Sequence, residues 1–212
     1  MPGHPIFASM YDRLFAASEK AGLREMRAEV LAQAHGRVLE LGAGTGLNLD
    51  HYGESVTELV LTEPDPHMAK RLREKLAAET NPFQVDVVET GAERLPFDDR
   101  SFDCVTATLV FCTIPDPEAA ATEVLRVLKP DGALLLIEHV RDPDEGGLSR
   151  WQDRLERPWG WFAGGCHPNR DTVSMLGGAF DVSALRRDGF PGPVPPLAKP
   201  LVRGVATPSA TG

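Results

Sequence analysis

Short apolar runs alternate with amphipathic stretches along most of the chain. In the amphipathic stretches, apolar residues recur at three- and four-residue spacing, which is the period of a helix. The pattern predicts helices at 9–34, 66–79 and 116–132, a helix that begins at 47–53, and strands at 37–42, 58–64, 83–90, 102–111 and 133–140. Strands that alternate with helices of this length indicate a doubly wound α/β sheet, Rossmann-like and mostly parallel, with helices on both faces.

The pattern changes after residue 140. Residues 141–172 contain all three tryptophans and have little strand character. Two closing strands are predicted at 180–188 and 201–207, which brings the sheet to seven strands. The predicted regions are an N-terminal helical lid (1–35), a ligand-binding core (36–140), a substrate-side helical insertion (141–179) and closing strands of the same domain (180–208).

The composition is that of a globular protein without a nucleic-acid partner. The 212 residues are 42% hydrophobic and carry a formal net charge of −9, whereas phosphate binding favours a basic surface. Three widely spaced cysteines imply no disulfide framework and favour a reducing cytosol. The sequence contains neither a secretory signal nor an apolar run of ~18 residues. We therefore expect a soluble, cytoplasmic monomer or homodimer with no membrane anchor.

Three glycines follow the first predicted strand, in the stretch VLELGAGTGLNLD (38–50). No Gly-Lys-Ser/Thr ending follows Gly42, Gly44 and Gly46, which argues against a nucleoside triphosphatase. The dinucleotide fingerprint requires a third glycine where this chain has Leu47. A nucleoside that lies across bare main chain is compatible with the turn, because glycine lets a ligand approach the backbone closely.

Two further features follow the next two strands. Glu63 ends the second strand, where a carboxylate can accept hydrogen bonds from both ribose hydroxyls. The loop 90–99 follows the third strand and can present main-chain N–H groups and Glu93 to an adenine edge. Each feature alone is common, but all three lie in order at the carboxyl ends of consecutive strands, where ligands bind in such sheets.

The chain resembles the class I S-adenosylmethionine-dependent methyltransferases. The matching stretches are LELGAGTG (39–46), TEPDP (62–66), GAERLPF (91–97), LVFCTIPDP (109–117) and EVLRVLKPDGALLLIEH (123–139). The resemblance implies S-adenosyl-L-methionine as cofactor, S-adenosyl-L-homocysteine as product, and a last strand that runs antiparallel. It implies that the cofactor is bound by Tyr11, Glu40, Gly42, Ala43, Gly44, Thr45, Gly46, Asn48, Glu63, Pro64, Met68, Ala92, Glu93 and Leu109.

A closer resemblance, to the methyltransferase-like alkyl thiol methyltransferases, lies downstream in EHVRDP and RWQDRLERPWGWFAGGCHPNRDT. It implies a small, apolar thiol as the methyl acceptor. Similar small bacterial methyltransferases act on quinone rings or phospholipid amines, so transfer to oxygen, nitrogen or carbon is the alternative. Two alternatives come from other functional classes: a nicotinamide-dependent oxidoreductase and a binding protein without catalysis. Leu47, which replaces the third glycine of the dinucleotide fingerprint, counts against the oxidoreductase.

Residues near the acceptor follow from this resemblance. His139 is the candidate base or orienting group, with a hydrogen-bonded structural histidine as the equal alternative. Aromatic residues of 151–162 form an apolar wall for the acceptor or the core of a small lid. The residues predicted to contact the acceptor are Cys112, His139, Trp151, Trp159, Cys166, His167 and Arg170.

Three of these predictions have a second interpretation. Cys166 adjoins His167, and a zinc site formed by these two residues with Cys112 is the second interpretation. The paired Cys-x-x-Cys or histidine spacing of zinc sites is absent, so we expect no metal. Arg170, next to Asp171, either positions an acceptor carboxylate or caps a helix. Tyr11 either closes over the methyl donor or packs against the sheet edge.

Overall fold

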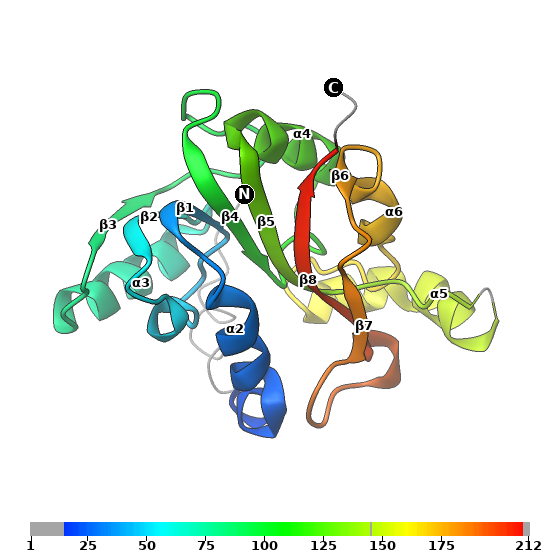
Figure 1. Cartoon of the computed structure of the whole chain (residues 1–212). Helices are drawn as coiled ribbons and strands as arrows, with labels where there is room; N and C mark the ends of the chain where they lie inside the picture. The colour runs from blue at the N-terminus through cyan, green and yellow to red at the C-terminus, as the bar shows by residue number, and fades with distance from the viewer. Residues whose placement is uncertain (1–14, 145, 210–212) are drawn as a thin grey trace.

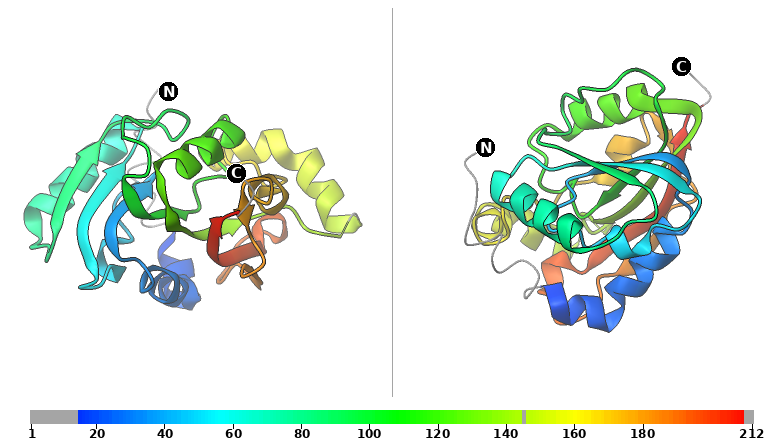
Figure 2. Two further views of the ribbon diagram at one scale, coloured as in Figure 1. Left: turned by 45° about the horizontal axis from the view of Figure 1, so that its top comes forward. Right: turned by 90° about the vertical axis from the view of Figure 1, so that its left-hand side faces the viewer.

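The computed structural model describes residues 15–144 and 146–209, which form a twisted sheet with helices on both faces (Figure 1, Figure 2). The strands are β1 (Gly36–Leu41), β2 (Val56–Thr62), β3 (Gln84–Val88), β4 (Phe102–Thr108), β5 (Leu128–His139), β6 (Phe180–Asp181), β7 (Arg186–Gly189) and β8 (Pro200–Pro208). The helices are η1 (Glu19–Leu23), α2 (Arg24–Leu31), η2 (Leu49–His51), α3 (Pro66–Ala78), α4 (Pro117–Val127), α5 (Gly147–Phe162), α6 (Thr172–Leu176) and η3 (Pro196–Ala198).

The strand order is β3-β2-β1-β4-β5-β8-β6, and β7 also pairs with β8. Strands β1 to β5 are paired in parallel, whereas β8 runs antiparallel to β5. The predicted mostly parallel sheet with an antiparallel last strand is therefore confirmed. Because the carboxyl ends of parallel strands meet at one edge of the sheet, the segments that follow β1, β2, β4 and β5 gather there.

Each face of the sheet packs against its own helices. Inward-facing residues of α2 and α3, such as Val30 and Leu72, belong to one apolar cluster with Val38 and Leu59 of the sheet. The other cluster joins α4 and α6 to the opposite face. Figure 2 shows α2 and α4 on opposite sides of the sheet. Burial of both faces explains why the central strands read as nearly continuous apolar runs.

The prediction that a helix begins at 47–53 is wrong. The chain makes successive turns there, and its helical structure is limited to the single 3-10 turn η2. The glycine before this segment, Gly46, has a φ of +81°, outside the helical region. The side chains of Asn48 and Tyr52 both hydrogen-bond Glu40 of β1, which draws the segment against the strand.

The prediction of a single strand at 180–188 is also wrong, because the structure has two short strands there, β6 and β7. A turn separates the two, in which Leu185 N–H donates to Val182 O and Ser183 N–H donates to the Asp181 carboxylate. Both pieces pair with the same strand, β8. The predicted helix at 9–34 is helical over residues 15–31 of its described part, but Gly22, with a φ of +130°, interrupts it.

Helix α2 is tied to the C-terminal strands by ion pairs. Glu29, on the outer face of α2, accepts hydrogen bonds from Arg186 of β7 and Arg203 of β8. Arg203 also donates to Asp188. These contacts join segments that lie more than 150 residues apart in the sequence. A lid role for residues 1–35 stays a prediction.

Within the described residues, no helix combines the length and the apolar character that a bilayer crossing needs.

Candidate functional site

The glycine turn after β1 has a backbone that side chains would disfavour. Gly42, Gly44 and Gly46 have φ values of +57°, +58° and +81°, in the left-handed region. A Cβ at Gly42 would lie 2.4 Å from Val110 Cγ2, so a side chain there would also collide with the segment after β4. Thr45, between the glycines, is buried. The turn therefore presents main chain rather than side chains to the edge of the sheet.

Glu63 lies against this turn. Its Oε2 accepts a hydrogen bond from Gly44 N–H and its Oε1 one from Asp65 N–H, both at 2.8 Å. Burial raises the pKa of Glu63, although these two main-chain hydrogen bonds lower it. The structure thus brings Glu63, the residue predicted to bind the ribose, into direct contact with the predicted glycine turn.

A buried polar network lies beneath the turn. Asn48 Nδ2 donates to Glu40 Oε1 at 2.9 Å and to Thr108 Oγ1 at 3.1 Å. Tyr52 donates to Glu40 Oε2 at 2.7 Å. Burial raises the pKa of Glu40 to about 7, against the lowering effect of the hydrogen bonds from Tyr52 and Asn48. The side chains that contact Glu40 hold both of its oxygens in fixed directions.

Arg27 of α2 joins this network and was missed by sequence reasoning. It is buried, and its Nη1 donates to Asn48 Oδ1 at 2.7 Å, while its Nε pairs with Glu19 at 3.0 Å. The sequence contained a signal for its burial, because Arg27 lies on the buried face of α2 together with Val30 and Leu31. A pocket at this point is lined by Arg27, Glu40, Gly42, Ala43, Leu47, Asn48 and Thr108.

The other predicted cofactor residues surround the same edge. Met68 is buried in the first turn of α3, whereas Pro64 is exposed. Ala92 is buried, and the Glu93 carboxylate turns back over Gly91. Leu109 follows β4 with a φ of +56°, a strained conformation for a residue with a side chain. Tyr11 lies outside the described residues.

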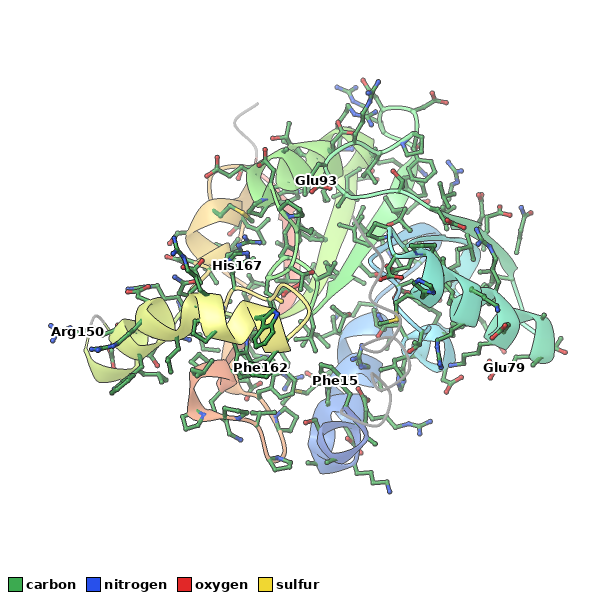
Figure 3. The ribbon with its side chains drawn as sticks, turned by 180° about the vertical axis from the view of Figure 1, so that it is seen from behind. Phe15, Glu79, Glu93, Arg150, Phe162 and His167 are labelled. Atoms are coloured by element: carbon green, nitrogen blue, oxygen red, sulfur yellow. The ribbon has the colours of Figure 1, made fainter. Side chains whose placement is uncertain are left out.

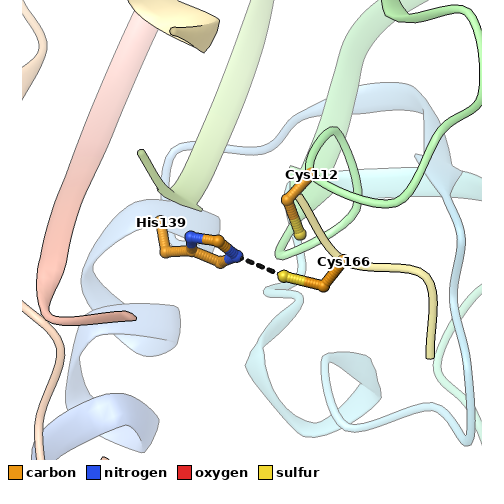
Figure 4. Close-up of side chains that lie close together, drawn as sticks. All are labelled: Cys112, His139 and Cys166. Carbon is orange, nitrogen blue, oxygen red and sulfur yellow. Dashed lines mark hydrogen bonds between the residues drawn. The ribbon is translucent and has the colours of Figure 1, made fainter. Parts of the chain in front are cut away.

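The fold brings together Cys112, His139 and Cys166 (Figure 4). They come from the segment after β4, the end of β5 and the loop after α5. One side-chain atom of each lies within 4.8 Å of the others, and all three residues are buried. His139 Nε2 is 2.7 Å from Cys166 Sγ, and Trp159 Nε1 donates to the same sulfur at 3.2 Å. These four predicted acceptor residues are therefore neighbours.

The three groups perturb one another's proton affinity. A hydrogen bond from Cys112 is the largest factor that lowers the pKa of Cys166, and His139 lowers it further against the effect of burial. The same hydrogen bond and burial raise the pKa of Cys112. Burial alone would lower the pKa of His139, but its contact with Cys166 raises it. The arrangement favours a thiolate at Cys166 beside a protonated or proton-sharing imidazole.

Glu138 and Arg170 fix the segment that carries Cys112. Glu138 Oε1 accepts hydrogen bonds from Val110 N–H at 2.7 Å and Phe111 N–H at 2.8 Å. Burial raises the pKa of Glu138 to about 7, against the effect of these two bonds. Arg170 Nη1 donates to the carbonyls of Phe111 and Ile114. In this structure, Arg170 thus binds main chain, and its predicted contact with an acceptor stays a prediction.

The remaining acceptor predictions are placed differently. His167 is half-buried, and its side chain points to α5, where its Nδ1 lies 2.8 Å from Glu156 Oε1. Its main-chain N–H contacts the cluster segment by donating to Cys112 O. Trp151 is 55% exposed and lies under Arg154, so the structure does not bring it to the cluster. Figure 3 shows Arg150 at the outer end of α5 and Phe162 at the other end, near His167. Of the predicted aromatic wall, Trp159 hydrogen-bonds the cysteine–histidine cluster, whereas Trp161 and Phe162 are exposed.

Comparisons with known proteins agree with this geometry. Residues 39–136 match the family model of the methyltransferase domain. Human thiol S-methyltransferase TMT1B is 34% identical over 176 residues, which are 81% of this chain and 71% of the human protein. The match to rat TMT1B, 35% identical over 136 residues, spans 64% of this chain but only 55% of the rat protein.

A second type of relative differs in its acceptor. A phosphatidylethanolamine N-methyltransferase of Cereibacter sphaeroides is 31% identical over 158 residues, or 73% of this chain and 76% of that protein.

The fold is shared with solved structures. An S-adenosylmethionine-dependent methyltransferase from Thermotoga maritima superposes with a TM-score of 0.67 at 23% identity, covering 95% of this chain and 97% of that one. The family model, the relatives that match over most of their length and this fold agree. The chain belongs to the class I S-adenosylmethionine-dependent methyltransferases.

Proposed function

We propose that this protein transfers the methyl group of S-adenosylmethionine to the thiol sulfur of a small apolar molecule. The observation that supports this proposal most directly is the buried cluster of Cys112, His139 and Cys166. The cluster lies where β4 and β5 end, and β4 pairs with β1, the strand that leads into the glycine turn. The thiol S-methyltransferase relatives support the same acceptor.

The residues of this chain fit the cofactor. We propose that bare main chain at Gly44 and Gly46 receives its amino-acid part, that Glu63 receives the ribose, and that buried Arg27 attracts its carboxylate. When bound, the cofactor supplies a methyl group on a positively charged sulfur. We propose that the loop that carries Ala92 and Glu93 contacts the adenine.

The protein's task is mainly alignment, because methyl transfer from a sulfonium is an in-line displacement at carbon. A thiol is partly ionised at neutral pH and strongly nucleophilic, so it needs less help from a base than an alcohol or an amine does. His139 is a buried titratable group at the end of β5, and we propose that it holds the acceptor sulfur or takes its proton. Its Nδ1 makes no hydrogen bond with any described residue.

The test uses radiolabelled S-adenosylmethionine with alkyl thiols, phenols and primary amines of matched size. We expect label in the thiols. We expect His139→Ala to lower the rate by at least about tenfold while the cofactor dissociation constant stays nearly unchanged. His35→Ala, which changes an exposed histidine, is the control and should keep the wild-type rate. Label in amines or phenols alone would reject the thiol proposal.

A further inference from the structure

The cysteine–histidine cluster has the composition of a metal site. Cys112, His139 and Cys166 offer two sulfurs and one imidazole nitrogen, all within 4.8 Å of one another and all buried. Each residue comes from a different segment, so no local sequence motif indicates that the three side chains meet. The sequence argument against a metal relied on the absence of paired spacing, and the fold removes that objection because it joins ligands that lie 27 residues apart.

The donor types select the ion. Thiolate and imidazole are the ligands of zinc and other thiophilic ions, whereas magnesium and calcium need oxygen ligands. Structural zinc sites have four protein ligands, but catalytic zinc sites have three, Cys₂His among them, and keep the fourth position open. The described residues supply three ligands at this point. The count therefore matches a site that leaves one position for an outside group.

The distances permit binding after a small adjustment. Zinc–nitrogen and zinc–sulfur bonds of about 2.0 and 2.3 Å at a tetrahedral angle require the nitrogen and sulfur to lie about 3.5 Å apart. His139 Nε2 and Cys166 Sγ, now 2.7 Å apart, would move apart by roughly 1 Å. The indole of Trp159 already donates to Cys166 Sγ and would orient this ligand.

We propose that Cys112, His139 and Cys166 bind one zinc ion, and that its open position takes the sulfur of the acceptor thiol. The metal site itself stands on the cluster alone, whereas the occupant of the fourth position rests on the proposed function. His139 then acts as a ligand rather than as a base. The acceptor S–H bond breaks, its proton goes to water, and the sulfur binds the ion as a thiolate. That sulfur forms the new bond to the methyl carbon as the carbon–sulfonium bond breaks, which yields a thioether and S-adenosylhomocysteine.

The first experiment measures metal content of the full chain, purified with a reductant and equilibrated with zinc. We expect about one zinc per chain, and far less in Cys112→Ser and Cys166→Ser. Cys104→Ser is the matched control: this buried cysteine also has a histidine nearby, His35 at 3.5 Å, but lies outside the cluster. It should bind zinc like the wild type. Equal zinc in all four proteins, or none in the wild type, would overturn the site.

Cobalt keeps the test informative if a cysteine variant fails to fold. Wild-type protein stripped with a chelator and loaded with Co²⁺ should show thiolate-to-metal charge-transfer bands and the visible bands of a tetrahedral ion. A small alkyl thiol should shift the visible bands, because it enters the coordination sphere. Absent bands would overturn the site. Mass spectrometry that finds a Cys112–Cys166 disulfide as the stable form under reductant would also overturn it.

The two proposals fail separately. Zinc bound by the cluster without methylation of thiols would leave the metal site standing and reject the thiol acceptor. Full thiol methylation by metal-free protein would leave the proposed function standing and reject the role of zinc.

Discussion

At the residue scale, the Glu63 side chain is oriented before a ligand arrives. Two main-chain N–H groups, of Gly44 and Asp65, hold its two oxygens. A carboxylate fixed in this way pays little further ordering cost when it accepts a hydroxyl group. Its position between the glycine turn and the end of β2 is the reason that we assign it to the ribose.

Replacing Glu63 with alanine is expected to weaken S-adenosylmethionine binding by at least ~1 kcal/mol, because a charged hydrogen-bond acceptor is lost. Isothermal titration calorimetry measures this. Glu58→Ala, at the amino-terminal half of the same strand, is the control and should keep the wild-type affinity. An unchanged affinity in the Glu63 variant would mean that the ribose binds elsewhere.

Arg27 is a residue of the donor-side network that the sequence did not lead us to predict. An arginine on an amphipathic helix is usually solvated, so its place on the apolar stripe of α2 carried little weight. Its burial depends on Asn48 and Glu19, and the contact with Asn48 forms only after the chain folds. The place of Glu63 beside the glycine turn was predictable, because it follows a strand directly. Its contact with the ribose stays a prediction.

At the element scale, the glycine turn and the segment after it separate what a local pattern can and cannot predict. The glycines marked the turn correctly. The helix expected at 47–53 did not form because the buried Glu40 draws Asn48 and Tyr52 toward β1. Strand 180–188 was divided for a local reason, because the Asp181 carboxylate accepts a hydrogen bond from Ser183 N–H in the turn that ends the first piece. A tertiary contact thus decides the first case and a local turn decides the second.

Gly42→Ala tests the turn. A φ of +57° and a Cβ 2.4 Å from Val110 Cγ2 should together lower the free energy of unfolding by more than ~1 kcal/mol and weaken cofactor binding. Urea denaturation and calorimetry measure the two effects. Gly53→Ala is the control, because a Cβ there meets no atom within 4 Å. Equal behaviour of the two variants would contradict the proposed strain.

At the scale of the whole molecule, the sheet was the most predictable feature. Alternating strands and helices specify a parallel sheet, and the change of pattern after residue 140 marked where a different arrangement begins. The cysteine–histidine cluster was not predictable as a unit. Cys112 and Cys166 were considered together with His167 rather than with His139. The distance between the two cysteines depends on the loop after α5, which no sequence period describes.

The pH dependence of stability follows from buried Glu40, whose pKa in the folded protein is raised to about 7 from an ordinary 4.5. A raised carboxyl pKa stabilises the fold below the unfolded value, and this stability is lost as the pH rises through the folded value. We expect the free energy of unfolding to fall between about pH 5.5 and about pH 8, with Glu40 contributing on the order of 2 kcal/mol.

Urea denaturation of the wild type and Glu40→Gln at both pH values isolates this contribution. The variant should lose less stability over the interval, and the dependence that it keeps belongs to other groups such as Glu138, whose pKa is also raised to about 7. The same pH dependence in both proteins would contradict the assignment to Glu40.

Glu29 gives the molecule a mechanical link between its two ends. It sits two residues from Arg27 on α2, yet its own partners, Arg186 and Arg203, belong to the last strands. We expect a disturbance of β7 or β8 to reach Arg27, to which we assign the cofactor carboxylate, through this one helix. Changes in these two strands should therefore alter the affinity for the cofactor.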